Sequence, residues 1–304
     1  MAQSLLWRWR RQRRVAFCFA ILLGGFGSIT QAWGFSNDQL TEPRTAQRII
    51  TLAPHLTELV FSAGAGDKLV GVIEHSDYPS EAQRLPTVGN YSHLNIEKII
   101  ALRPDLILGW SSGNRPRDLK KLAQLGHTLR ITDIHRLEDI PLQIRTIGEI
   151  AGTEAQATAV AQTLTDTLAK LRQHYRQAAP ISVFYQVWGK PYITVNGAQF
   201  ISQGIEVCHG RNVFADLPSL SAEVGLESIL RADPQVILLG GEANQQRLWL
   251  QAWQTIPGLA AVEKQQIYPL NSDWLQRPTA RFIQALPDVC QTLDKARKAY
   301  GEGI

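Results

Sequence analysis

One stretch of the sequence has the residue spacing of a covalent catalyst. Residues 109–113 read GWSSG, which fits the G-x-S-x-G nucleophile elbow of α/β-hydrolases and follows an apolar run typical of a strand. In that elbow the helix begins directly after the serine, whereas here further residues intervene and Pro116 is better placed to begin it. No later histidine stands out as a partner base. A serine hydrolase using Ser111 is therefore a remote alternative, and we predict no catalytic residue.

The histidines raise the question of metal binding. His55, His75 and His93 all follow strand-like segments of the N-terminal half, where ligand loops gather, but they lack the HxxxH or HxH spacing of a metal site. Hydrogen-bonded or solvent-facing loop histidines explain them more simply. Walker, GxGxxG and HExxH motifs are absent from the sequence. We therefore predict neither a metal site nor a cofactor.

Aromatic residues in polar loops give a stronger signal for binding. They are Tyr78 in SDYP, Tyr91 in GNYS, Trp110 in GWSSGN, Trp188 in QVWGKPY and Trp274 in SDWLQRP. Core packing explains aromatic residues on helices well and those in loops less well. In open α/β sheets, ligands bind beyond the carboxyl ends of the strands. A crevice lined by such residues, with few charges, suits a large, flat, amide-bearing ligand.

A twelve-residue pattern occurs twice, about 130 residues apart. Residues 97–108 read EKIIALRPDLIL and residues 227–238 read ESILRADPQVIL, and both begin with glutamate and place proline seven positions later. The pattern predicts a helix, a proline and a buried strand that includes Ile107, Leu108, Ile237 and Leu238. Glu97 and Glu227 open the helices, where the helix dipole favours a carboxylate. Structural first-turn acids and surface acids that meet a partner both remain open explanations.

The elements that must position these residues alternate between strand and helix. From Arg48 to about residue 150, and again from residue 180, apolar runs typical of strands alternate with amphipathic segments, which favours parallel sheets covered by helices. Residues 153–177 contain no Gly or Pro, and apolar positions 157, 160, 161, 164, 168 and 171 share one helical face. We expect Thr153 to cap this helix, and Pro287 to bend or interrupt the last one.

The predicted fold class is α/β, with two Rossmann-like lobes of mainly parallel sheets joined by one long helix. The predicted boundaries are a signal peptide at 1–34, an N-terminal lobe at 35–152, a connecting helix at 153–179 and a C-terminal lobe at 180–304. The signal peptide is predicted from an arginine-rich start, a short apolar run and small residues near Ala32 and Gly34.

The net charge changes when this leader is set aside. The chain carries 31 basic and 27 acidic residues, and five of the basic residues are leader arginines. The mature protein is therefore nearly neutral, which argues against nucleic acid or an anionic membrane as a partner. Cys208 and Cys290 are the two cysteines outside the leader. Export favours a disulfide between them, while unpaired thiols and, less readily, a zinc site remain alternatives.

Several of these motifs together carry a family resemblance. ITLAPHLTEL, SDYP, LNIEKIIALRPDLILGW, the long helix, EVCHGRNVF, ESILRADPQVIL and NSDWLQRPTAR resemble the periplasmic cobalamin-binding proteins of ABC importers, whose two lobes are joined by one rigid helix. The resemblance covers nearly the whole mature chain. The TE and PDLIL elements are shared with siderophore- and haem-binding relatives, which gives an alternative ligand class.

The resemblance implies roles for individual residues. Ligand contacts fall on Tyr78, Tyr91, Trp110, Trp188, Asp273, Trp274 and Arg277, transporter docking on Glu97 and Glu227, and the family disulfide on Cys208 and Cys290. It implies a periplasmic monomer that delivers a cobalamin or related corrinoid to an ABC-transporter permease. One departure is that the loop with Leu220 and Ser221 lacks the tryptophan that the family has there.

Overall fold

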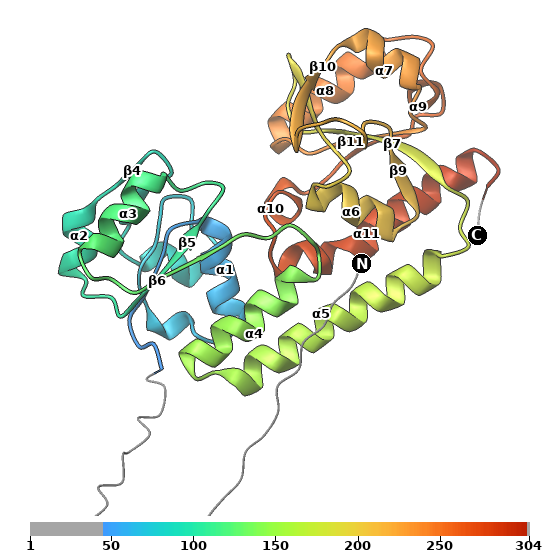
Figure 1. Ribbon diagram of the computed structural model, residues 1–304. Coiled ribbons are helices and arrows are strands. Elements are labelled where there is room, and N and C mark those ends of the chain that lie inside the picture. The colour runs from blue at the N-terminus through green and yellow to red at the C-terminus, as the bar shows by residue number, and fades with distance from the viewer. Residues whose placement is uncertain (1–44, 303–304) are drawn as a thin grey trace, which may run out of the picture. The chain divides into compact units, whose positions relative to one another are not determined.

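Two four-stranded parallel sheets organise the chain in the computed structural model, which describes residues 45–302. The predicted signal peptide lies outside the described residues. The first sheet has the order β2-β1-β5-β6 and the second has the order β12-β11-β7-β9. Figure 1 shows the two sheets with their helices and the long helix α5 between them in the sequence. The predicted α/β fold with two lobes and one connecting helix is confirmed.

The elements of the N-terminal half begin at Ile49 and end at Ala151. The strands are β1 (Ile49–Thr51), β2 (Leu69–Gly71), β3 (Gly89–Asn90), β4 (His93–Leu94), β5 (Leu106–Trp110) and β6 (Leu129–Thr132). The helices are α1 (Pro54–Ser62), η1 (Gly66–Lys68), η2 (Ser80–Arg84), α2 (Ile96–Ala101), α3 (Pro116–Gln124) and α4 (Asp139–Ala151). Strands β3 and β4 form a separate antiparallel pair.

The C-terminal half follows α5 (Glu154–Tyr175). Its strands are β7 (Ile181–Gln186), β8 (Tyr192–Val195), β9 (Gly210–Asn212), β10 (Ser221–Val224), β11 (Val236–Leu239) and β12 (Ile267–Pro269). Its helices are α6 (Phe200–Val207), α7 (Leu226–Ala232), α8 (Ala243–Gln254), α9 (Ala260–Glu263), α10 (Ser272–Leu275) and α11 (Ala280–Ala299). Strands β8 and β10 pair antiparallel, a feature that we did not predict from the sequence.

The central strands β5 and β11 are buried on both faces because helices cover each sheet. In β5, Leu106 and Leu108 point into one hydrophobic cluster and Ile107 into another, as the period of two in a strand requires. In β11, Leu238 and Ile237 divide in the same way. All four strand residues predicted to be buried are fully buried. The doubled sequence pattern therefore corresponds to a doubled structural unit.

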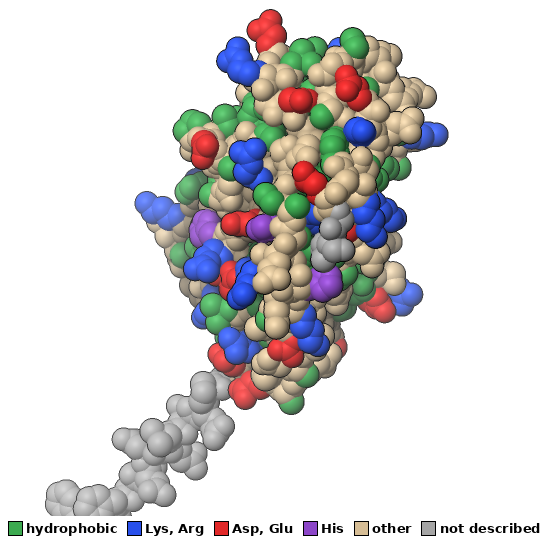
Figure 2. Space-filling view, turned by 90° about the vertical axis from the view of Figure 1, so that its right-hand side faces the viewer, with side chains coloured by type: hydrophobic (Ala, Val, Ile, Leu, Met, Phe, Trp, Pro, Cys, Tyr) green, Lys and Arg blue, Asp and Glu red, His purple; other side chains and the backbone are tan. Residues whose placement is uncertain are grey.

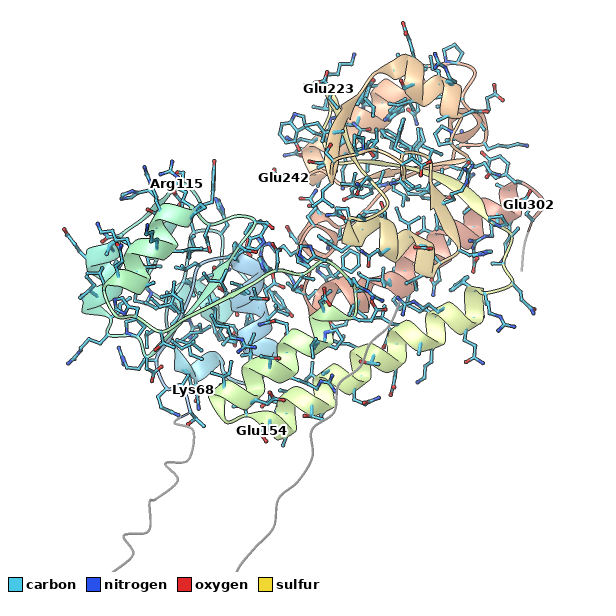
Figure 3. The ribbon with its side chains drawn as sticks, in the orientation of Figure 1. Lys68, Arg115, Glu154, Glu223, Glu242 and Glu302 are labelled. Carbon is cyan, nitrogen blue, oxygen red and sulfur yellow. A yellow bond between two sulfur atoms is a disulfide. The ribbon has the colours of Figure 1, made fainter. Side chains whose placement is uncertain are left out.

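Helix α5 links the two sheets through a shared core. The predicted apolar face is confirmed, because Ala157, Ala161, Leu164 and Leu168 are buried and the helix packs against α4 and α11. Its 22 residues span about 33 Å at 1.5 Å per residue. The helix begins at Glu154, labelled in Figure 3.

The expected cap of one helix and the expected interruption of another are wrong. Thr153 lies at the N-cap of α5 but makes no side-chain capping bond, and its buried hydroxyl has no partner within residues 45–302. Pro287 lies inside α11, which is continuous from Ala280 to Ala299, so the expected interruption does not occur, while a bend there stays a prediction. Phe282 and Cys290 are buried on either side of the proline, so tertiary packing outweighs the lost backbone hydrogen bond there.

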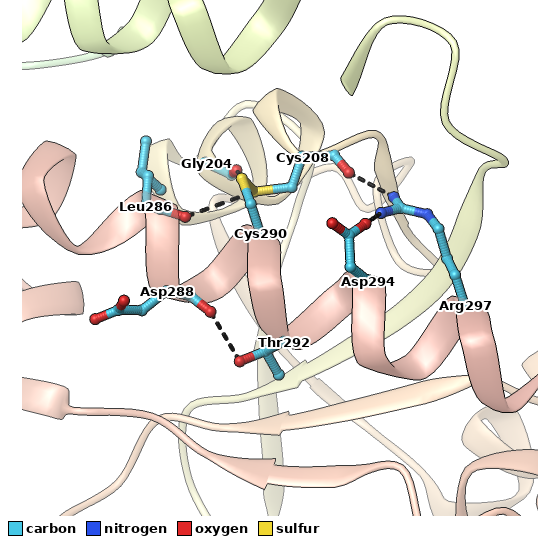
Figure 4. Close-up of a disulfide and its surroundings, with 8 residues drawn as sticks. All are labelled: Gly204, Cys208, Leu286, Asp288, Cys290, Thr292, Asp294 and Arg297. Atoms are coloured by element: carbon cyan, nitrogen blue, oxygen red, sulfur yellow. Dashed lines mark hydrogen bonds and ion pairs between the residues drawn. A yellow bond between two sulfur atoms is a disulfide. The ribbon is translucent and has the colours of Figure 1, made fainter. Parts of the chain in front are cut away.

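The predicted disulfide is confirmed. Cys208 and Cys290 are bonded, are fully buried and lie 82 residues apart in the sequence, and they join the end of α6 to α11 (Figure 4). Arg297 is also fully buried and donates to the carbonyl of Cys208 at 2.5 Å and to Asp294 at 2.6 Å. The disulfide and this arginine fix α11 against the end of α6.

No helix among residues 45–302 is long and apolar enough to cross a membrane. On the face shown in Figure 2, acidic and basic side chains are interspersed.

Candidate functional site

A cavity of ≈ 370 Å³ lies between residues of the two halves, within the range typical of ligand pockets. Its N-terminal wall follows the carboxyl ends of β1, β5 and β6, where ligands of open α/β sheets bind. The lining residues are Pro54, His55, Trp110, Ser112, Asp133, Ile134 and His135 from the N-terminal half, and Ala198, Gln199, Phe200, Leu220, Gln276, Arg277 and Pro278 from the C-terminal half.

Trp110 is the principal aromatic residue of this cavity. Its indole Nε1 donates to Asp133 Oδ1 at 3.0 Å, and its ring meets the His55 ring edge-to-face, with 5.1 Å between centroids. A Cβ at Gly113 would overlap the indole ring at 1.9 Å. The second glycine of GWSSG is therefore required by the packing of the Trp110 ring. This packing explains the glycine without any nucleophilic chemistry.

Asp133 organises the polar side of the wall. It accepts hydrogen bonds from the indole of Trp110, from Ser111 Oγ at 2.7 Å and from Ser112 Oγ. Burial acts to raise the pKa of Asp133, but these three donors hold it below its ordinary value. A carboxylate with a lowered pKa is a poor base for activating a serine. Asp133 is the hydrogen-bond partner of the Ser111 hydroxyl within residues 45–302, so the elbow lacks its histidine.

His55 lies in the first turn of α1 and is only 6% exposed. Burial lowers the pKa of His55 to about 4; the Asp133 charge opposes this shift and the Arg277 charge adds to it. The imidazole is therefore neutral at pH 7 and presents a polar but uncharged group beside Trp110. Our expectation of a loop histidine was wrong for this residue, because the helix begins directly after β1.

The C-terminal wall is apolar with an amide rim. Phe200 packs edge-to-face on Phe282 with 4.9 Å between ring centroids, and Leu220 lines the cavity while remaining exposed. Leu220 belongs to the loop in which the resemblance expects a tryptophan. The amide of Gln276 donates to the carbonyl of Gly240, which holds it at the rim.

The structure brings two of the seven predicted ligand contacts, Trp110 and Arg277, into this cavity. Tyr78, Tyr91 and Trp188 are exposed, and Tyr91 is 75% exposed on the β3–β4 turn. Trp188 meets Trp249 edge-to-face at 6.4 Å, whereas Asp273 and Trp274 on α10 border two other hollows. The role of these residues in binding stays a prediction.

Arg277 is already paired with protein carboxylates. Its Nη1 lies 2.6 Å from Asp77 Oδ1 and 3.0 Å from Glu58 Oε1. Burial acts to lower the pKa of Arg277, but the two carboxylates raise it above its ordinary value. Burial likewise acts to raise the pKa of Asp77, and the hydrogen bond and charge of Arg277 keep it low. The guanidinium at the cavity wall therefore stays charged.

Glu97 and Glu227 lie in the first turns of α2 and α7, do not line the cavity, and are both exposed. The pattern of burial from residue 91 to residue 100 repeats from residue 221 to residue 230. The two acids are therefore structurally equivalent. Among residues 45–302, no group of three or more side chains is arranged to hold a metal ion.

Comparisons with known proteins agree with this architecture. Residues 49–274 match the family described as periplasmic binding protein. The vitamin B12-binding protein of Vibrio cholerae is 40% identical over 85% of this chain and 93% of its own. The crystal structure of the periplasmic vitamin B12 binding protein of Vibrio cholerae gives a TM-score of 0.76 at 41% identity, covering 83% of this chain and 98% of that one. The apo periplasmic haem-binding protein of Roseiflexus gives 0.72 at 25% identity, covering 83% and 99%.

Proposed function

Because the chain belongs to the periplasmic binding protein family, we propose that it captures cobalamin, or a related corrinoid, in the cavity between its two lobes. The family and the similar curated proteins are binding proteins and not enzymes. The observation that carries the choice of ligand is the 40% identity over 85% of the chain with a vitamin B12-binding protein. The haem-binding protein of Roseiflexus has a lower sequence identity to this chain, 25%.

The chemistry of the cavity supports a corrinoid. Trp110, Phe200 and Leu220 supply apolar surface for a flat macrocycle, while Gln199 and Gln276 supply groups that can bond to peripheral amides. A corrinoid is larger than the cavity, so further contacts are needed outside it. The exposed residues predicted to supply them are Tyr78, Tyr91, Trp188, Asp273 and Trp274.

The partner in this proposal is an ABC-transporter permease, and the protein acts as a periplasmic monomer exported by the signal peptide predicted at 1–34. Glu97 and Glu227 are the proposed docking acids. Ile100 and Leu230 follow them by three residues, on the same helical face, and both are exposed. Each lobe would then present one carboxylate and one aliphatic side chain to the permease. Helix α5, continuous from Glu154 to Tyr175, is expected to limit motion between the lobes.

A side-by-side titration tests the ligand class. We expect quenching of tryptophan fluorescence to show cyanocobalamin binding at least about 100-fold more tightly than haemin or a ferric hydroxamate siderophore, because specificity is a difference between affinities. Free N-acetyltryptophanamide at equal tryptophan concentration corrects for absorption by the coloured ligands. If haemin or the siderophore binds more tightly, the ligand assignment is wrong, although the binding-protein fold would stand.

A further inference from the structure

Four charged side chains form a cluster that joins the two lobes. Glu58 on α1 and Asp77 after β2 come from the N-terminal half, and Arg277 and Arg281 come from the chain at the start of α11. The partners are 200 to 223 residues apart in the sequence. With two acids and two arginines, the cluster is electrically balanced. We name it the interlobe cluster.

Glu58 is the buried centre of the interlobe cluster. Its side chain is 2% exposed, and both of its oxygens are occupied. Oε1 accepts from Arg277 Nη1 at 3.0 Å and from Arg281 Nη2 at 2.5 Å, while Oε2 accepts from Arg281 Nε at 2.9 Å. A two-pronged arginine–carboxylate pair fixes direction as well as distance. The position of this carboxylate therefore determines where both guanidinium groups lie.

Glu58 gives Arg277 its buried partner at the cavity wall. The other carboxylate, Asp77, accepts from Arg277 Nη1 at 2.6 Å and from Nη2 at 3.3 Å, but its side chain is 53% exposed and is reached by water. Glu58 does not line the cavity, whereas Arg277 does. Any effect of Glu58 on the ligand must consequently pass through the residues it holds.

Glu58 also orients a second predicted ligand contact, Tyr78, through Arg281. Its guanidinium carbon lies 3.8 Å from the centroid of the Tyr78 ring, within the range of a cation–π contact. Tyr78 is exposed and needs such a contact to keep one orientation. One carboxylate thus supports two predicted ligand contacts, Arg277 directly and Tyr78 through Arg281.

We propose that Glu58 is a positioning residue of the ligand site, which orients Arg277 and Tyr78 toward the ligand without touching it. The inference rests on the proposed function for its ligand. Stability alone explains the cluster poorly, because a buried ion pair is often no more stabilising than apolar residues of the same volume. The glutamate of the TE element, which the sequence links only to the superfamily, thereby acquires a role in this site.

The test combines a readout without ligand and a readout with ligand. In the ligand-free protein, nitrogen-15 NMR of the arginine side chains measures rotation of the guanidinium groups, with Arg277→Lys and Arg281→Lys used to assign the signals. We expect slow rotation for both arginines in the wild type and fast rotation for Arg277 in Glu58→Gln. If Arg277 stays immobilised in Glu58→Gln, the proposal is wrong, whatever the ligand.

The second readout is the affinity for cyanocobalamin. Glu58→Gln is expected to weaken binding at least about tenfold, as loss of one partner of a buried charge pair does. In an Arg277→Gln/Tyr78→Ala background, the same change is expected to alter affinity by about twofold or less, because its route to the ligand is gone. An equal loss of affinity in both backgrounds would mean that Glu58 acts through residues other than Arg277 and Tyr78, and would contradict the proposal.

Two controls protect the interpretation. Glu138→Gln removes a surface carboxylate that pairs with Arg172 at 2.6 Å, and we expect it to leave affinity and Arg277 rotation unchanged. If Glu58→Gln does not fold, Glu58→Gln/Arg281→Gln removes both buried charges together and the same two readouts apply. If the wild type fails to bind cyanocobalamin, the proposed function fails, and the NMR readout still decides whether Glu58 positions Arg277.

Discussion

Replacing Glu97 and Glu227 together by arginine is expected to abolish transport while binding of cobalamin stays within about twofold of the wild type. Both acids are exposed at equivalent places and neither lines the cavity, so the change reverses two partner contacts without altering the ligand site. Folding tolerates it, because an unfavourable charge at a helix N-terminus costs only about 0.3–1 kcal/mol. Uptake of labelled cyanocobalamin into vesicles that contain the cognate permease measures the effect.

A matched variant separates docking from a general effect of charge. Glu81→Arg/Glu154→Arg also reverses two exposed first-turn acids, but these lie on η2 and α5 and lack the equivalence of the docking pair. We expect this control to transport normally, and each single docking reversal to be intermediate. If the Glu97 and Glu227 double variant transports like the wild type, these acids serve only their own helices.

Replacing both Cys208 and Cys290 by alanine is expected to lower the free energy of unfolding by about 4 kcal/mol. The bond closes a loop between residues 82 apart, and in the chain-entropy account its removal releases that loop in the unfolded state. Urea denaturation followed by circular dichroism measures the change. Dithiothreitol should shift the wild type toward the variant and leave the variant unchanged. Equal midpoints for the two proteins without reductant would contradict the prediction.

The sequence predicted those parts of the fold that depend on local patterns. Short apolar runs identified β5 and β11, and an unbroken amphipathic pattern identified α5. Both signals are contained in a short segment of the sequence and do not depend on distant residues. The antiparallel pair β8 and β10 was missed because α6 and β9 lie between the two strands in the sequence, so no local pattern indicates their pairing. The continuity of α11 through Pro287 was also missed, since packing on both sides of the proline decides it.

Only those cavity-lining residues that belong to a sequence motif were singled out from the sequence. Trp110 and Arg277 came from motifs and line the cavity. His55 and Asp133 were missed, because their meeting with Trp110 depends on the ends of β1, β5 and β6 lying at one sheet edge. A search of the residues after each predicted strand would have found His55. It would have missed Asp133, because the predicted strand ran past Thr132, where β6 ends. The pairing of Glu58 with Arg281, across 223 residues, has no local signal at all.

The central claim, that cobalamin binds in the cavity beside Trp110, is tested most directly by calorimetric titration of the purified protein from residue 35 onward with cyanocobalamin. We predict saturable binding of one ligand per chain with a dissociation constant at or below about 1 μM. Trp110→Ala should weaken it at least about tenfold, because an aromatic residue that the ligand covers is a typical hot spot. Leu125 is exposed after α3 and does not line the cavity, so Leu125→Ala should leave the affinity unchanged. No saturable binding at micromolar concentrations, or equal affinity in wild type and Trp110→Ala, would contradict the claim.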